Sequence, residues 1–209
     1  MFAVPSTSAA QTELATFGGF FTPTADVAEW TIVMERTRPP PAPSLITITR
    51  RIRHNTAVTV GARLTVWLSR WVGVEAALAC APSSVELSVT SSEDYEASEI
   101  LDAMLLAATG RALLRFPLPS DVATLHVAGG LGVLNRSGDG YEGFSRTNEL
   151  VAVLGLGMNV RISESLAIRV DLEDYLSSPS LAYGDSQVEN HFQHSLVIAC
   201  SLAVSLSGE

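Results

Sequence analysis

The clearest pattern in the chain is an alternation of apolar and polar positions from Ala57 to Cys80. Every even-numbered residue from Val58 to Leu68 is apolar, and the odd-numbered positions between them include Arg63. After a break at Ser69-Arg70-Trp71 the alternation resumes in phase, with Glu75 on the polar face. Alternation with a period of two is typical of a strand that has one apolar and one polar face. The stretch therefore predicts a β-hairpin.

The same alternation recurs along the rest of the chain. Residues 100–116 also have a helix-like content of Leu and Ala. We interpret them as a strand because a helix would isolate Arg111 among apolar residues. The predicted strands are residues 13–22, 57–68, 72–90, 100–116, 122–134, 148–162, 166–173 and 191–206.

The connections between these eight strands alternate in length along the chain. The flanks of Pro39–Pro43 are extended in character and are expected to lengthen the first hairpin beyond the body of the fold. Short turns on one side and long loops on the other are typical of outer-membrane barrels. The long connections are 24–56, 91–99, 135–147 and 176–190, and the short ones are 69–71, 117–121 and 163–165.

Composition narrows the class of protein. Apolar residues make up 47% of the 209 residues and charged residues 17%, against about 25% charged in a typical soluble domain. The chain contains no run of about 18 apolar residues, which a transmembrane helix needs. The remaining way for so apolar a chain to cross a membrane is a closed barrel whose strands are apolar at alternate positions. The net charge of −9 argues against a nucleic-acid partner.

The polar face is expected to line the lumen of this barrel. It is diluted by small residues, as a narrow filled lumen requires, and its basic residues are Arg rather than Lys, which suits buried pairing with carboxylates. The alternative is a soluble, lipocalin-like barrel with reversed faces that binds a small apolar ligand. The predicted lumen charge network is Arg63, Glu75, Arg111, His126, Arg161, Arg169, Asp171 and Glu173.

Two pairs within that network carry specific expectations. Arg63 and Glu75 are equidistant from Ser69, so we expect them to lie nearly opposite each other in the hairpin. Asp171 and Glu173 share a face and could form an acid/base pair. We favour a structural ion network because Arg169 is beside them.

Several stretches resemble the small eight-stranded outer-membrane β-barrels of the OmpA/OmpX type. The resemblance spans about residues 13–206 and implies an all-β, eight-stranded antiparallel up-and-down transmembrane β-barrel with short periplasmic turns and long external loops. The stretches are Phe17-Gly18-Gly19-Phe20-Phe21, Val60 to Trp67, Val72-Gly73-Val74-Glu75, Gly129-Gly130-Leu131-Gly132 and Leu154-Gly155-Leu156-Gly157-Met158.

The spacing of His and Ser argues against catalysis. His126 has Ala128 two positions on, and His194 adjoins Ser195, so these two side chains point to opposite faces. We predict no catalytic, cofactor or metal residues, with a lipid-modifying barrel enzyme as the less favoured alternative. The loop acids Glu93, Asp94, Glu96 and Asp139 lack an ordered cation-ligand pattern, and the basic cluster Arg50, Arg51 and Arg53 is interpreted as part of a solvated loop rather than a binding patch.

These interpretations divide the chain into an N-terminal tail, residues 1–12, and a barrel domain, residues 13–206. Ser8-Ala9-Ala10 resembles the end of a signal peptide, and a short disordered tail is the alternative. Cys80 and Cys200 fall on the apolar face of the third and eighth strands, so no disulfide is expected. The expected protein is a monomer in the bacterial cell outer membrane. It contacts membrane lipid and lipopolysaccharide. Its filled lumen is expected not to conduct, so we expect a structural, envelope-integrity or surface-binding role through its external loops, which would contact any extracellular ligand.

Overall fold

The computed structural model describes residues 11–36, 44–92, 95–119, 122–145, 147–183 and 188–206. The predicted tail, the Pro-rich segment 39–43 and the loop acids Glu93 and Asp94 lie largely or wholly outside these ranges. In the described part of the chain, no helix is long and apolar enough to cross a membrane. The elements are β1 (Gln11–Pro23), β2 (Ala28–Arg36), β3 (Ser44–His54), β4 (Ala57–Trp67), β5 (Val72–Ser91), β6 (Glu96–Pro117), β7 (Ala123–Ser137), η1 (Asp139–Tyr141), β8 (Phe144–Ser145), β9 (Asn148–Arg161), β10 (Leu166–Ser177), β11 (Ala182–Tyr183), β12 (Val188–Asn190) and β13 (Gln193–Ser205).

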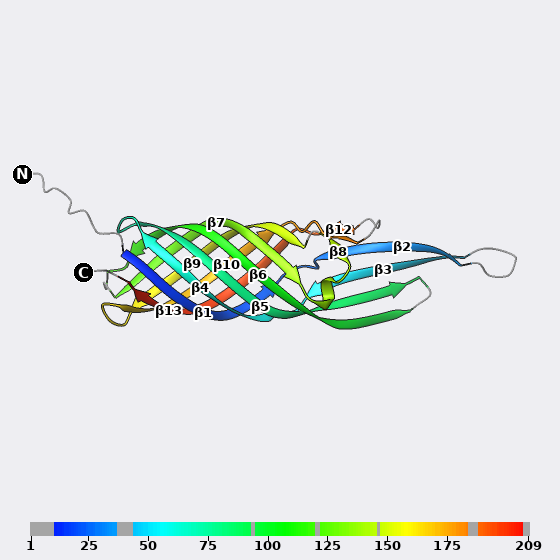
Figure 1. Cartoon of the computed structure of the whole chain (residues 1–209), viewed down its shortest axis with the longest axis horizontal. Helices are drawn as coiled ribbons and strands as arrows, with labels where there is room; N and C mark the ends of the chain where they lie inside the picture. The colour runs from blue at the N-terminus through cyan, green and yellow to red at the C-terminus, as the bar shows by residue number, and fades with distance from the viewer. Residues whose placement is uncertain are drawn as a thin grey trace, which may run out of the picture.

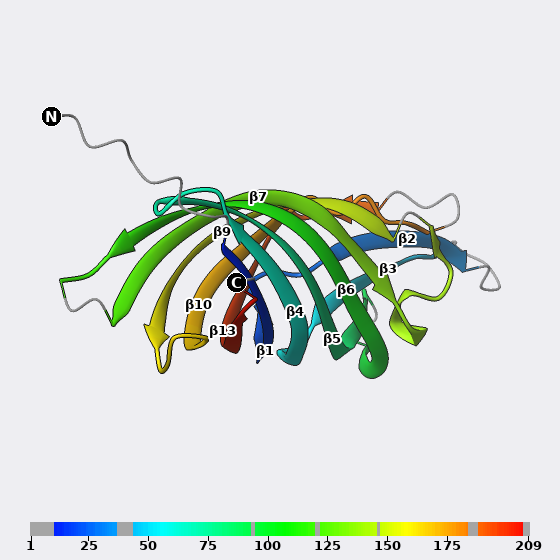
Figure 2. The same ribbon diagram turned by 60° about the vertical axis from the view of Figure 1, so that its left-hand side comes forward.

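Eight of these strands form a closed antiparallel barrel (Figure 1). Their order around the wall is β1-β4-β5-β6-β7-β9-β10-β13, and β13 pairs with β1 to complete the ring. Figure 2 shows the tilt of the strands across the wall. The predicted eight-stranded up-and-down barrel is confirmed, including the choice of strand for residues 100–116. The predicted short turns, the start of β1 and the end of β13 lie at one end, which we call the periplasmic end by analogy with outer-membrane barrels.

The outer wall of the barrel is apolar on all eight strands. The positions predicted to be apolar are exposed, as at Leu78 (65%), Leu154 (57%) and Ile198 (58%), whereas Arg63 and Glu75 are buried. This is the orientation in which lipid solvates the wall and polar side chains fill the lumen. The alternative of a soluble barrel, with its charged face toward water, is therefore wrong.

A sheet extends beyond the barrel at the end opposite the short turns (Figure 1). It consists of β12, β2, β3, residues 85–91 of β5 and residues 96–103 of β6, and we call it the protruding sheet. The extended flanks of the Pro-rich segment thus pair as the hairpin β2–β3, residues 28–36 with 44–52, and β3 joins the sheet through β5. The connection predicted as loop 24–56 is largely this hairpin.

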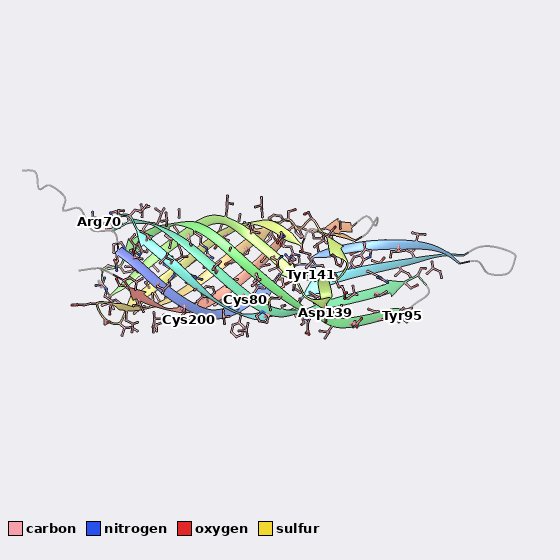
Figure 3. The ribbon with its side chains drawn as sticks, viewed as in Figure 1. Arg70, Cys80, Tyr95, Asp139, Tyr141 and Cys200 are labelled. Carbon is pink, nitrogen blue, oxygen red and sulfur yellow. The ribbon has the colours of Figure 1, made fainter. Side chains whose placement is uncertain are left out.

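Two apolar clusters support the two parts of the fold. One lies in the barrel lumen on the side of the protruding sheet and includes Phe17, Phe21, Leu105, Leu134 and Val153. The other lies where the barrel meets the protruding sheet and contains Val27, Ala28, Trp30, Ile52, Val85, Ala103, Tyr141 and Leu181. Figure 3 places Tyr141 at this junction. The second cluster gives the protruding sheet a core of its own.

The two cysteines lie on different parts of the wall. Cys80 is on β5 and Cys200 is on β13, with β4 and β1 between those strands. Both thiols are free.

We expect a charge on the outer wall to destabilise the barrel in a lipid bilayer. Leu156 faces outward near the middle of β9, and Leu156→Arg should cost about 2–4 kcal/mol because the guanidinium must enter the hydrocarbon. The measurement is urea unfolding from phospholipid vesicles. Ser98→Arg in the protruding sheet is the control and should change the free energy of unfolding by less than about 0.5 kcal/mol. Equal effects of the two changes would contradict a lipid-facing wall.

Candidate functional site: a ring of ion pairs across the lumen

Six charged side chains meet in the lumen in the half nearer the periplasmic end. Arg63 comes from β4, Glu75 from β5 and Arg111 from β6, and each is at most 4% exposed. The other three come from β10, where Arg169, Asp171 and Glu173 occupy alternate positions. Alternate residues of a strand share a face, so β10 supplies a cation and two acids to the same space.

These side chains form a closed ring in which cations and anions alternate. Each guanidinium contacts two carboxylates, and each carboxylate contacts two guanidinium groups. Three positive charges therefore meet three negative ones, which leaves no net charge in the ring. We call this set the ion ring, and its contacts in order are Arg63–Asp171, Asp171–Arg169 at 2.9 Å, Arg169–Glu75 at 2.5 Å, Glu75–Arg111 at 3.5 Å, Arg111–Glu173 at 2.5 Å and Glu173–Arg63 at 2.8 Å.

The ion ring ties opposite walls of the barrel together. Three strands separate β5 from β10 in either direction around the ring of strands. The contact between Glu75 and Arg169 therefore crosses the full width of the lumen. The hydrogen bonds of the sheet hold neighbouring strands, whereas this ion pair joins strands that are not neighbours.

Polar and aromatic neighbours satisfy much of the remaining hydrogen-bonding capacity of the ring. The Thr65 hydroxyl donates to Glu75 at 2.8 Å, and Arg111 donates to the Tyr175 hydroxyl at 2.8 Å. His126 Nε2 lies 2.8 Å from Asp171 Oδ1. The Arg63 guanidinium lies 4.4 Å from the centre of the Phe17 ring, a cation–π distance. Such contacts offset part of the cost of removing six charges from water.

Two glycines make room for these large side chains. Gly157 pairs across the wall with His126, and a Cβ at residue 157 would come within 2.5 Å of His126 and Asp171. Gly130 pairs with Arg111, and a Cβ there would come within 2.1 Å of the Gly110 carbonyl oxygen and 2.9 Å of the Arg111 side chain. Small residues were expected to dilute the lumen face. Gly157 makes room for His126 and Asp171, and Gly130 is required both by the β6 backbone and by Arg111.

Seven of the eight residues of the predicted network meet in this part of the lumen. The exception is Arg161, which is exposed at the periplasmic rim and does not reach the ring. The expectation that Arg63 and Glu75 lie opposite each other is also wrong. The register pairs Arg63 with Ala77 and Glu75 with Thr65, because the turn is centred on Arg70 rather than Ser69. Arg63 instead contacts acids of β10.

Tyr175 was not among the predicted lumen residues, although it continues the inward positions of β10 by one step. A second buried ion pair was also missed. Arg136 donates to Glu149 at 3.0 and 2.5 Å on the side of the lumen near the protruding sheet. Both residues lie on the inward face. Arg136 falls in the connection predicted as loop 135–147, whereas Glu149 falls at the start of the predicted strand 148–162.

Among the described residues, Ser, His and acidic side chains do not come together in the manner of a triad. His54 Nδ1 lies 3.5 Å from Ser83 Oγ, but the other ring nitrogen contacts the Tyr141 hydroxyl rather than an acid. His194 lies 3.0 Å from Asp174 on the outer wall, whereas Ser195 is buried on the lumen side. In the described residues, no group of three or more His, Cys, Asp or Glu side chains is placed to hold a metal ion. Arg51 of the predicted basic cluster pairs with Asp26 and Glu29, and these acids raise its pKa.

A second polar pair, His54 and Tyr141, lies where the barrel meets the protruding sheet. His54 is buried, and the Tyr141 hydroxyl forms a hydrogen bond with its Nε2. Burial lowers the pKa of His54 to about 3, and the positive charge of Arg136 adds to the effect. Burial also raises the pKa of Tyr141 to about 12. Both side chains are therefore neutral near pH 7, so the tyrosine hydroxyl donates to the imidazole.

This architecture is that of known outer-membrane proteins. The outer membrane protein OprG of Pseudomonas aeruginosa superposes with a TM-score of 0.58 at 13% identity, covering 95% of this chain and 98% of that chain. The outer membrane protein AlkL, determined by solid-state NMR in lipid bilayers, superposes with a TM-score of 0.57 at 8% identity, covering 100% and 96%. No protein-family model and no curated protein matches the sequence. The fold and the apolar wall together define the class: an eight-stranded outer-membrane β-barrel.

We expect Glu75→Gln to destabilise the barrel by about 3–5 kcal/mol, because Arg169 and Arg111 each lose a buried counter-charge. The matched control is Glu99→Gln, an exposed position of the protruding sheet. It should change the free energy of unfolding by less than about 0.5 kcal/mol. Urea unfolding from phospholipid vesicles measures both. Similar small losses for the two variants would show that Glu75 is solvated.

Acid should loosen the junction between the barrel and the protruding sheet. The pKa of His54 is about 3 in the folded protein and about 6.5 when exposed, so an opened state binds a proton that the closed state does not. The closed junction around His54 therefore has its full stability above about pH 6.5. Below that pH, its free energy of opening falls by up to about 1.4 kcal/mol per pH unit.

Acrylamide quenching of Trp30 fluorescence, in protein with Trp67→Phe and Trp71→Phe, reports this opening. Quenching should rise between about pH 6.5 and about pH 4. His54→Gln should abolish the rise, whereas His194→Gln on the outer wall should preserve it. An unchanged acid response in His54→Gln would mean that another group is responsible.

Proposed function

We propose that the protein is a non-conducting barrel of the outer membrane that acts at the cell surface through its protruding sheet. Membrane lipid and lipopolysaccharide contact the outer wall, and the barrel serves as the anchor of the sheet. The observation that carries this proposal is the combination of an obstructed lumen with a sheet that leaves the membrane on a core of its own. We propose no catalytic role, in line with the separation of His194 from Ser195.

Three successive layers support a closed lumen. The ion ring spans the lumen from β5 to β10. Next to the ion ring, toward the protruding sheet, lie the apolar side chains of the barrel cluster, which leave a cavity of about 20 Å³. That volume holds about one water molecule. The Arg136–Glu149 pair and the His54–Tyr141 pair follow toward the outside.

The protruding sheet offers an unpaired strand edge. Strand β6 pairs with β7 from Met104 onward, so in the described residues Glu96–Ala103 pairs with β5 alone. The carbonyl oxygens of Ala108 and Gly110 point to β7. Because backbone direction alternates along a strand, the N–H and C=O groups of Ser98 and Ile100 point to the open side. Such an edge can accept an added strand from a partner.

Side chains give this edge a charge preference. Glu96, Glu99 and Asp102 are exposed on it, and Ile100 is 70% exposed. Acidic groups at a strand edge disfavour pairing with a second acidic strand and favour a basic one. We therefore propose that the partner is an extended segment that carries basic residues.

Planar-bilayer recording tests the closed lumen. Purified protein should produce no current steps above the lipid background, because side chains fill an eight-stranded barrel. A porin added to the same bilayer afterwards shows that insertion and detection work. Steady ohmic steps from the protein alone would contradict a closed lumen.

The strand edge is tested by removing one donor. Ile100→Pro deletes an N–H that faces the open side and leaves the pairing with β5 in place. Binding of the full chain in nanodiscs to an immobilised peptide of alternating Lys and Val should fall about tenfold, a loss of about 1.4 kcal/mol. The matched change Ile100→Ala, which retains the N–H, should bind like the parent. Equal binding of Ile100→Pro and Ile100→Ala would rule out strand addition.

A further inference from the structure

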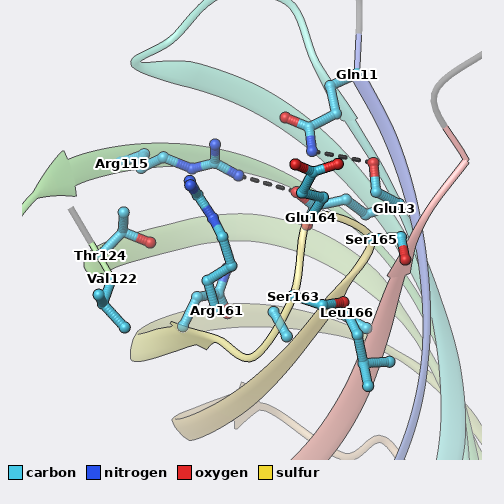
Figure 4. Close-up of a pocket in the computed structure, with 14 residues that line it drawn as sticks. Gln11, Glu13, Arg115, Val122, Thr124, Arg161, Ser163, Glu164, Ser165 and Leu166 are labelled. Atoms are coloured by element: carbon cyan, nitrogen blue, oxygen red, sulfur yellow. Dashed lines mark hydrogen bonds and ion pairs between the residues drawn. The ribbon is translucent and has the colours of Figure 1, made fainter.

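A polar pocket of about 70 Å³ opens at the periplasmic mouth of the barrel, at the opposite end from the protruding sheet (Figure 4). It lies between the ends of β1, β6, β7, β9, β10 and β13, below the ion ring. Its walls include two arginines, Arg115 and Arg161, and the hydroxyls of Thr124, Ser163 and Ser165. The proposed surface role of the protein makes no use of this pocket.

Arg115 is held in place from two sides. It donates to Glu13 at 3.1 Å, and its guanidinium lies 3.4 Å from the centre of the Trp67 ring. A planar cation stacked on an aromatic ring loses little further freedom when it binds a ligand. Arg115 is thus a pre-positioned group in the pocket wall.

Arg161 has no comparable partner. No carboxylate of the described residues lies within ion-pair distance of its guanidinium, although Arg161 lines the same pocket as Glu13 and Glu164. Figure 4 shows its guanidinium pointing toward that of Arg115, with Glu164 on the side of Gln11 and Glu13. Two converging like charges repel each other, and an anion between them would remove that repulsion.

Asn159 gives independent evidence of an unmet partner. Its side chain lines the pocket and the residue is 8% exposed, yet its Oδ1 has no hydrogen-bond partner. A buried amide atom without a partner costs about 1–3 kcal/mol. The oxygen and nitrogen of such an amide are interchangeable by rotation, so the same side chain can donate to an oxyanion.

We propose that this pocket is a binding site for a small oxyanion of the phosphate or carboxylate class. Arg161 and Arg115 supply the positive charge, and the Asn159 amide and the neighbouring hydroxyls supply neutral hydrogen bonds. The guanidinium group suits this ligand because its planar donors match two oxygens of a phosphate or carboxylate. The anion is either free in the periplasm or part of a lipid headgroup that reaches the barrel rim.

The test uses the full chain in dodecyl maltoside, which carries no phosphate. The Nε–H signals of Arg115 and Arg161 are followed by NMR while inorganic phosphate is added, and separately while glycerophosphoethanolamine is added. Saturable shifts of both signals are expected. Tighter binding of inorganic phosphate assigns the site to a free anion, and tighter binding of glycerophosphoethanolamine assigns it to a lipid headgroup; either result supports the oxyanion site.

Variants separate the pocket from general attraction of anions. Arg161→Gln should weaken binding at least tenfold, and Arg161→Glu should abolish the shift of the Arg115 signal. Arg70→Gln is the matched control, because Arg70 is exposed at the same end and lies outside the pocket. Heat-dependent gel migration verifies that each variant is folded. Shifts that do not saturate, or equal binding in Arg161→Gln and Arg70→Gln, would overturn the proposal.

Discussion

The alternation of three guanidinium groups with three carboxylates around a closed ring is the interaction on which the interior of this barrel depends. A charge in the lumen is far from water and is tolerated only with a well-placed counter-charge. Each member of the ion ring has two such partners, so the set is neutral and each charge is shared. The small residues opposite it, such as Gly157 and Gly130, follow from the space that these side chains need.

The ion ring also connects the barrel wall at the end opposite the protruding sheet. Its ion pairs join β10 to strands on the far side of the barrel, and the apolar cluster lies next to it, toward the protruding sheet. The strands β5 and β6 then continue past the barrel, where they receive β3 and β2 and gain a second core. This arrangement supports the proposed role at the cell surface.

Most of the fold was predictable because the period-two pattern fixes which residues share a face. It placed Glu75, Arg111 and Asp171 together in the lumen without any knowledge of their contacts. The pattern did not predict the partners of Arg63 and Glu75, because the pairing register depends on the centre of the turn. A shift of one residue in that centre changes the partner of every residue in the hairpin. Arg161 follows the same alternation, but it lies at the periplasmic rim and does not reach the ion ring. The pairing of β3 with β5 could not be predicted, because long-range strand partners leave no periodic signal.

A double-mutant cycle between Glu75 and Arg169 is the most direct test of an ion ring that crosses the lumen. The cycle compares the free energies of unfolding, from lipid vesicles, of the parent, Glu75→Leu, Arg169→Met and the double variant. Direct contact at 2.5 Å predicts a coupling energy of about 1–3 kcal/mol, with the double variant more stable than the sum of the single losses implies. Losses that add to within about 0.5 kcal/mol would contradict a contact between these opposite walls.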